Sequence, residues 1–74
     1  MNIKEVLKEA CRHRGMTQTE LAEACGMSQS NLAHKLARGT LTLNEWEQLS
    51  EACGFKLQIR FIAVDGGLAY ETEY

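Results

Sequence analysis

The sequence contains no proline, no closely spaced pair of cysteines and no long hydrophobic run. A membrane-spanning helix needs about 20 consecutive apolar residues, and no stretch approaches that length. The first residues lead directly into amphipathic sequence, without the features of a targeting segment. The 74 residues are therefore expected to form one cytoplasmic domain, near the lower size limit for a chain that folds alone.

The cysteine pattern argues against both disulfides and metal. The chain has three cysteines, Cys11, Cys25 and Cys53, which lie far apart in the sequence. Disulfide frameworks use an even number of cysteines, and metal sites use closely spaced ones. No metal and no cofactor is predicted. Each cysteine is interpreted as a small buried apolar residue. Cys11 looks the more exposed of the three, and a redox role there is the alternative.

Catalytic motifs are also missing from the sequence. No pair of carboxylates falls in an apolar setting, and no glycine-rich phosphate-binding loop is present. His13 and His34 have no serine or cysteine nucleophile at a recognisable motif. The chain is therefore not expected to be an enzyme.

Charge is divided unevenly along the chain, whose net charge is −2. Residues 1–39 carry six Lys or Arg against four Asp or Glu, a net +2, and residues 40–74 carry two against six, a net −4. A polyanion is expected to meet the N-terminal half.

Four helices are predicted in residues 3–53, because each apolar periodic segment has its own start and stop signals. Each follows a residue suited to capping a helix and precedes a glycine suited to ending one. The capping and terminating pairs are Asn2 and Gly15, Thr17 and Gly26, Ser28 and Gly39, and Thr42 and Gly54. TQTE and TLNE are capping boxes. Apolar positions expected to face the core include Ile3, Val6, Leu7, Ala10, Leu21, Ala22, Leu32, Leu36, Leu43, Trp46, Leu49 and Cys53.

A two-residue alternation replaces the helical period after Gly54. FKLQIRFIAV and LAYETEY alternate apolar and polar residues on either side of Asp65-Gly66-Gly67, as expected of a β-hairpin. A two-stranded hairpin is marginal in water unless its apolar face is covered. It is expected to pack either on the fourth helix or on its copy in a second chain. The predicted dimer contacts are Phe55, Leu57, Ile59 and Phe61.

Residues 18–37 form a compact pattern in which Gln18 opens one helix, Cys25-Gly26-Met27 forms an apolar–Gly–apolar turn, and Leu32 is the inward anchor of a second helix. In this pattern the segment resembles the XRE family of helix-turn-helix repressors, similar to phage Cro and phage repressors. The family usually has an apolar residue where Lys35 stands, so Leu36 is expected to take over as an anchor. The resemblance extends over roughly residues 3–53 and implies a lambda-repressor-like domain. The predicted fold is mainly α with a small β element: residues 1–54 form the helix-turn-helix domain and residues 55–74 its candidate dimerisation hairpin.

The third predicted helix, which follows Ser28, exposes neutral side chains that can form hydrogen bonds. On most solvated helix surfaces these positions carry charged residues. With Leu32 and Leu36 inward, Ser30 and His34 point outward and Gln29 lies beside them. Side chains of this kind suit base edges in the major groove of DNA. By the resemblance, Gln29, Ser30 and His34 contact bases, and Gln18 contacts the DNA backbone. The other predicted backbone contacts are Ser28, Asn31, Lys35 and Arg38.

The predicted function is a transcriptional regulator that binds specific double-stranded DNA, in the simplest case a homodimeric repressor with a near-palindromic operator. The alternative is an antitoxin that represses its own promoter through the helix-turn-helix and binds a toxin through its C-terminal part. A third possibility is a helical domain in which the motif has only a structural role.

Overall fold

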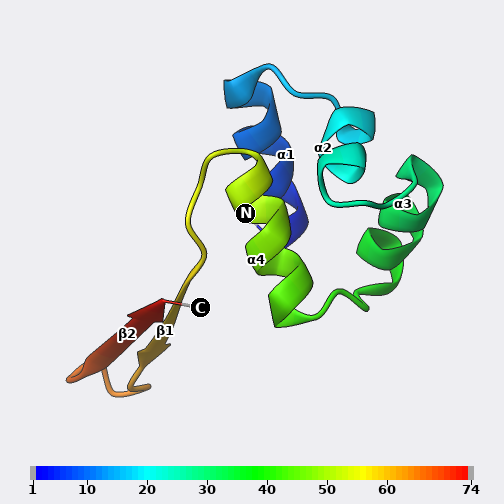
Figure 1. Ribbon diagram of the computed structural model, residues 1–74. Coiled ribbons are helices and arrows are strands. Elements are labelled where there is room, and N and C mark those ends of the chain that lie inside the picture. The colour runs from blue at the N-terminus through cyan, green and yellow to red at the C-terminus, as the bar shows by residue number, and fades with distance from the viewer. Residues whose placement is uncertain (1, 74) are drawn as a thin grey trace.

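The computed structural model describes residues 2–73, with side chains to residue 72, as four helices followed by a two-stranded antiparallel sheet (Figure 1). The elements are α1 (Ile3–Arg14), α2 (Gln18–Ala24), α3 (Gln29–Arg38), α4 (Leu43–Ala52), β1 (Gln58–Ile62) and β2 (Ala69–Glu73). This confirms the predicted fold class. In this part of the chain, no helix combines the length and the apolar composition that crossing a membrane requires.

Each helix begins directly after a residue whose side chain accepts a hydrogen bond from an amide of the first turn, which has no acceptor within the helix. The Thr17 hydroxyl accepts a hydrogen bond from the Glu20 amide at 3.1 Å, and the Glu20 carboxylate accepts one from the Thr17 amide at 2.9 Å. Thr42 and Glu45 form the same reciprocal pair at the start of α4. Asn2 caps α1 and Ser28 caps α3 through single side-chain acceptors. All four predicted helix starts are confirmed.

The hydrophobic core lies where the four helices meet. Its most enclosed side chains are those of Leu21, Leu32 and Leu49, each with 0% of its surface exposed. The remaining buried members are Leu7, Cys11, Ala22 and Cys53. Burying one leucine side chain contributes about 1.5–3 kcal/mol, so these residues supply much of the driving force for folding.

Three of the predicted core positions are wrong. Ile3 and Val6 of α1 are each 51% exposed, and Leu43 of α4 is 48% exposed. Leu7 and Cys11, one helical turn apart, define the side of α1 that meets the core, so Val6 lies about 100° away around the helix axis. Ile3 and Leu43 are the first residues of their helices. The core of these short helices does not extend to those positions.

The sheet starts three residues later than the alternation in the sequence suggests. The Phe55 amide donates to the Ser50 carbonyl at 2.8 Å and so belongs to the end of α4. The Arg14 guanidinium bonds the Cys53 and Gly54 carbonyls, both at 3.2 Å, and lies 5.0 Å from the centre of the Phe55 ring. Arg14 therefore fixes the direction in which the chain leaves the helices.

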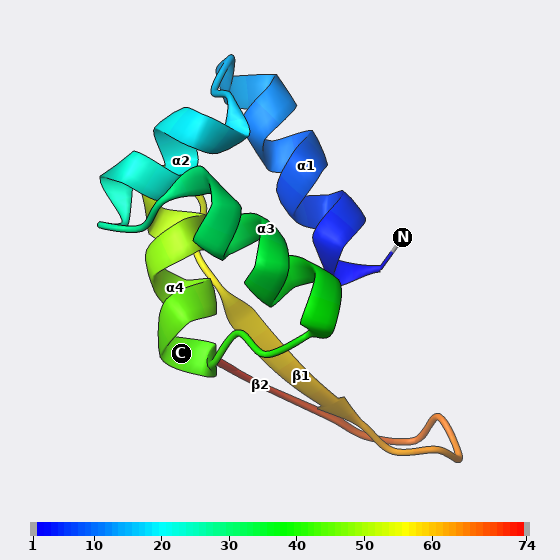
Figure 2. The same ribbon diagram turned by 90° about the vertical axis from the view of Figure 1, so that its right-hand side faces the viewer.

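The hairpin extends away from the helices as an arm (Figures 1 and 2). Phe61 pairs with Tyr70 and Ile59 with Thr72 across the two strands. The molecule measures 42 × 25 × 20 Å and has a radius of gyration of 13.6 Å, against about 11 Å for a compact domain of this length. Within a single chain the hairpin is not packed along α4, the first of the two expected arrangements. Tyr74 lies outside the described residues.

Candidate nucleic-acid interface

A tight turn sets the relative positions of α2 and α3. Gly26 adopts φ +71°, a left-handed conformation that residues with a β-carbon rarely adopt. The Gly26 amide donates to the Glu23 carbonyl at 3.1 Å, and the Met27 amide to the Ala22 carbonyl at 2.9 Å. The chain thus changes direction over residues 25–28, the last of which, Ser28, caps α3.

Small and apolar residues fill the contact between the two helices. Leu21 and Ala22 of α2 and Leu32 of α3 are fully buried, and Met27 in the turn packs against them. Ala22 has only a methyl side chain, which allows close approach. Leu36 is partly buried against the same core, so it does act as the second anchor of α3.

The opposite side of α3 is open to solvent and polar. Gln29, Ser30, Asn31 and His34 are all exposed. Within the described part of the chain, the side chains of Gln29, Ser30 and His34 form no hydrogen bond or ion pair. In Figure 2, α3 lies at the front of the molecule, uncovered by the hairpin or another helix. Three polar side chains that can form hydrogen bonds are therefore available on one rigid helix.

A family model described as helix-turn-helix matches residues 7–59, more than two thirds of the chain. The chain belongs to the XRE-type helix-turn-helix family. At the level of the family, this helix-turn-helix protein is a DNA-binding transcription regulator, and the family is generally non-enzymatic. No curated protein and no solved structure matches the chain significantly.

Four of the predicted backbone contacts lie beside α3 or at its ends in this helix-turn-helix protein. Gln18 begins α2 and lines a hollow of about 360 Å³ with Lys4, Glu5 and Lys8 of α1. Arg38 is exposed in the last turn of α3. Ser28 uses its hydroxyl to cap α3, where it accepts from the Asn31 amide at 3.1 Å. These two lysines were not predicted from the sequence to be DNA contacts. The excess of basic residues in the N-terminal half was the signal that could have identified them.

Lys35 has a partner that the sequence pattern did not reveal. Its ammonium donates to the Glu45 carboxylate of α4, and the side chains are only 32% and 20% exposed. This contact and the Thr42 amide lower the pKa of Glu45, with the Lys35 hydrogen bond as the largest cause. The ion pair joins the end of α3 to the start of α4. A DNA phosphate would have to compete with Glu45 for this lysine, and the predicted contact stays untested.

The cysteines have the environment of structural residues. Cys11 and Cys53 are 8% and 2% exposed, so the view of Cys11 as the more exposed cysteine is wrong. Burial raises the pKa of both thiols, and of the partly buried Cys25 thiol, which keeps them protonated. Since the thiolate is the reactive form, these sites are poorly suited to the redox role considered as an alternative.

The four residues predicted to contact a second chain have different environments. Phe55 is 41% exposed and held by Arg14, whereas Leu57 and Ile59 are half-buried. Phe61 is 74% exposed on the hairpin. Within one chain, these side chains do not form a single cluster, because the first two lie beside the helices and Phe61 lies on the arm.

Proposed function

We propose that this protein is a homodimeric repressor that binds a specific, near-palindromic operator by placing α3 in the major groove. The observation that carries the proposal is the set of exposed, unpaired Gln29, Ser30 and His34 side chains on one face of α3. The opposite face is fixed to the core through the buried Leu32. A rigid helix with neutral donors and acceptors can distinguish base edges without depending on charge alone.

Each proposed contact follows from the chemistry of its side chain. Gln29 can form two hydrogen bonds with an adenine edge, while Ser30 and His34 bond neighbouring base edges. Gln18 and Asn31 donate to phosphates on either side. Arg38 adds a charged contact at the end of the helix, and the N-terminus of α3, where Ser28 lies, favours a nearby phosphate.

One helix-turn-helix contacts too few bases for strong sequence specificity, and a second copy of the chain doubles the number of base contacts. Two copies related by a two-fold axis place two recognition helices about 34–36 Å apart, one turn of B-DNA. The hairpin and the segment before it supply the proposed dimer contacts, through Phe55, Leu57, Ile59 and Phe61. The large exposed surface of Phe61 supports this assignment.

Selection of bound sequences from random double-stranded DNA tests the proposal. We expect enrichment of two inverted half-sites whose centres are about one helical turn apart. The Gln29→Ala variant should lose preference at one base pair per half-site, at a cost of about 1–3 kcal/mol, and keep most of its non-specific affinity. Recovery of unrelated sequences by the unaltered protein would refute specific recognition by α3.

The hairpin also favours a second candidate function, that of an antitoxin which represses its own promoter. Tyr70 of β2 is 68% exposed, and in a two-stranded sheet β2 has one edge open for pairing with another strand. Co-expression with the product of a neighbouring gene tests this function. The antitoxin proposal requires that product to inhibit growth and the present chain to relieve the inhibition. A neighbour without toxicity would count against it.

A further inference from the structure

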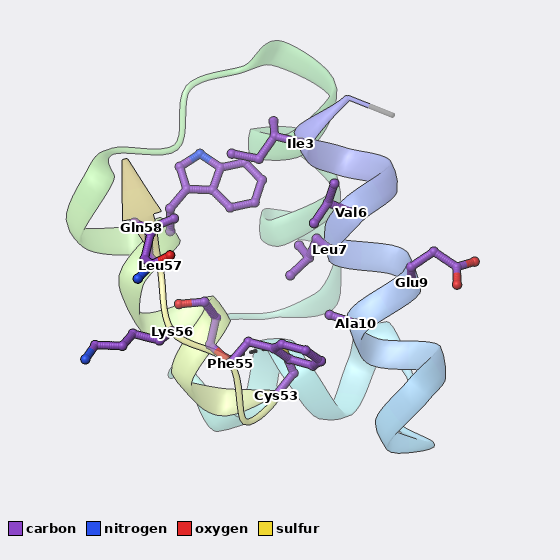
Figure 3. A pocket seen from close by; sticks show the side chains of 12 residues that line it. Ile3, Val6, Leu7, Glu9, Ala10, Cys53, Phe55, Lys56, Leu57 and Gln58 are labelled. Carbon is purple, nitrogen blue, oxygen red and sulfur yellow. Dashed lines mark hydrogen bonds between the residues drawn. The ribbon is translucent and has the colours of Figure 1, made fainter. Parts of the chain in front are cut away.

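An apolar groove runs along the side of the helices that faces away from α3. Its volume is about 820 Å³, and α1, α4 and the segment from Cys53 to Gln58 line it. Figure 3 shows Ile3, Val6 and Phe55 turned toward this space. Trp46 of α4 also lines the groove. These are the apolar residues that the single chain leaves only half covered, with Ile3 and Val6 51% exposed and Phe55 41% exposed.

The hairpin has an apolar face that is uncovered in the part nearer its turn. Strand alternation and pairing place Ile59, Phe61, Tyr70 and Thr72 on the same face. The opposite face carries the Arg60–Glu71 ion pair, whose atoms are 2.8 Å apart. Ile59 is half-buried, but Phe61 and Tyr70 are 74% and 68% exposed, so the part of this face nearer the turn lies in solvent although a stable hairpin must cover it.

The hairpin of the same chain does not fill this groove. Leu57 and Gln58 line the groove, and Gln58 is the first residue of β1. From there the strands run away from the helices (Figure 1), and Arg14 holds the preceding turn in place. Each chain therefore has one unfilled groove and one uncovered arm.

We propose that the groove receives the hairpin of a second copy of this chain, and that two copies exchange arms reciprocally. This inference rests on the homodimer of the proposed function and assigns its contact surfaces. Phe61 and Tyr70 of each arm lie against Ile3, Val6 and Trp46 of the other chain. A two-fold axis makes the two contacts identical, and neither copy is left with an open groove.

The area involved favours reciprocal exchange over docking of an unrelated partner. The exposed parts of Phe61 and Tyr70 amount to roughly 300 Å² per chain, since a large aromatic side chain buries about 150–250 Å². Covering them hides a similar area of groove, so two symmetric contacts bury about 1,200 Å², the lower limit for specific stable interfaces. A partner that fills one groove alone buries about half of that area.

A charge-complementation experiment tests the arrangement on the full chain without DNA. Val6→Lys places a charge in the groove, and Phe61→Glu places the opposite charge on the arm. Each variant alone should weaken self-association at least tenfold in sedimentation equilibrium, because an unpaired charge would be buried. Mixed together, they can form one unaltered contact and one Lys–Glu contact, and a heterodimer should reappear. Val64→Lys, at a fully exposed position beyond β1, is the control and should remain dimeric.

The outcomes separate the possible arrangements. Arm exchange would be overturned if the unaltered protein were monomeric. It would also be overturned if Val6→Lys stayed dimeric while Phe61→Glu did not, a result which would indicate that the hairpins pair with each other. Failure of the mixture to form a heterodimer from folded variants would also overturn it. Far-UV circular dichroism checks folding, and Ile3→Lys replaces Val6→Lys if the latter unfolds. If the protein proves monomeric but still selects a specific DNA sequence, base recognition by α3 stands and only the dimer is refuted.

Discussion

The salt dependence of DNA binding can decide which cations near α3 contact phosphate. Each phosphate neutralised on B-DNA contributes about −0.9 to the slope of log K against log salt concentration. Lys4 and Lys8 lie beside Gln18, and Arg38 is exposed at the end of α3. The Lys35 ammonium is bonded to Glu45 instead.

If Lys4, Lys8 and Arg38 each contact one phosphate, a bound dimer neutralises about six phosphates and should have a slope of about −5. Its affinity should then fall about a thousandfold between 50 and 200 mM salt. Including Lys35 would raise the count to eight and the slope to about −7. Arg38→Met should flatten the slope by about 2, whereas Lys35→Met should leave it unchanged and lower the urea midpoint through loss of the contact with Glu45.

Fluorescence anisotropy titrations at four or five salt concentrations measure these slopes on a fixed operator duplex. Arg60→Met, which removes a charge on the hairpin at a distance from α3, is the control and should keep the slope of the unaltered protein. If Lys35→Met flattens the slope as much as Arg38→Met does, Lys35 leaves Glu45 to contact phosphate. That result would refute our interpretation of the ion pair.

The remaining predictions concern stability. Leu32→Ala should cost about 2–5 kcal/mol in urea unfolding, because it leaves a cavity at a fully buried site; a loss below about 1 kcal/mol would contradict the tight contact of α2 with α3. Ser28→Ala should cost about 0.5–2 kcal/mol by removing the cap of α3, and Ser30→Ala, an exposed neighbour without that role, should have little effect. The pKa of Glu20 is lowered mainly by the Thr17 amide and that of Glu45 mainly by Lys35. Their stabilisation is thus present above the ordinary value of 4.5 and lost as pH falls through the lower folded-state pKa values. Melting temperatures should fall on acidification below about pH 4.5, and a flat profile down to pH 3 would argue against these contacts.

Features that depend on neighbouring residues were determined by the sequence itself. The helix caps join residues three positions apart, as Ser28 and Asn31 do, and the turn of the motif depends on one glycine, Gly26. The Asp65 carboxylate accepts from the Gly67 amide, so the hairpin turn is also local. These interactions have short range and need no information about the rest of the fold, and the family pattern around them was specific.

Only the tertiary structure decided which apolar residues are covered and which charges meet. Lys35 and Glu45 are brought together by the angle between α3 and α4, and Phe55 leaves the expected strand because Arg14, far away in the sequence, holds it against the end of α4. The periodic pattern of the sequence predicts that the apolar residues Val6 and Phe61 are buried. Whether residues of the same chain bury them depends on the length of the helices and on the direction of the arm, and these are properties of the whole fold.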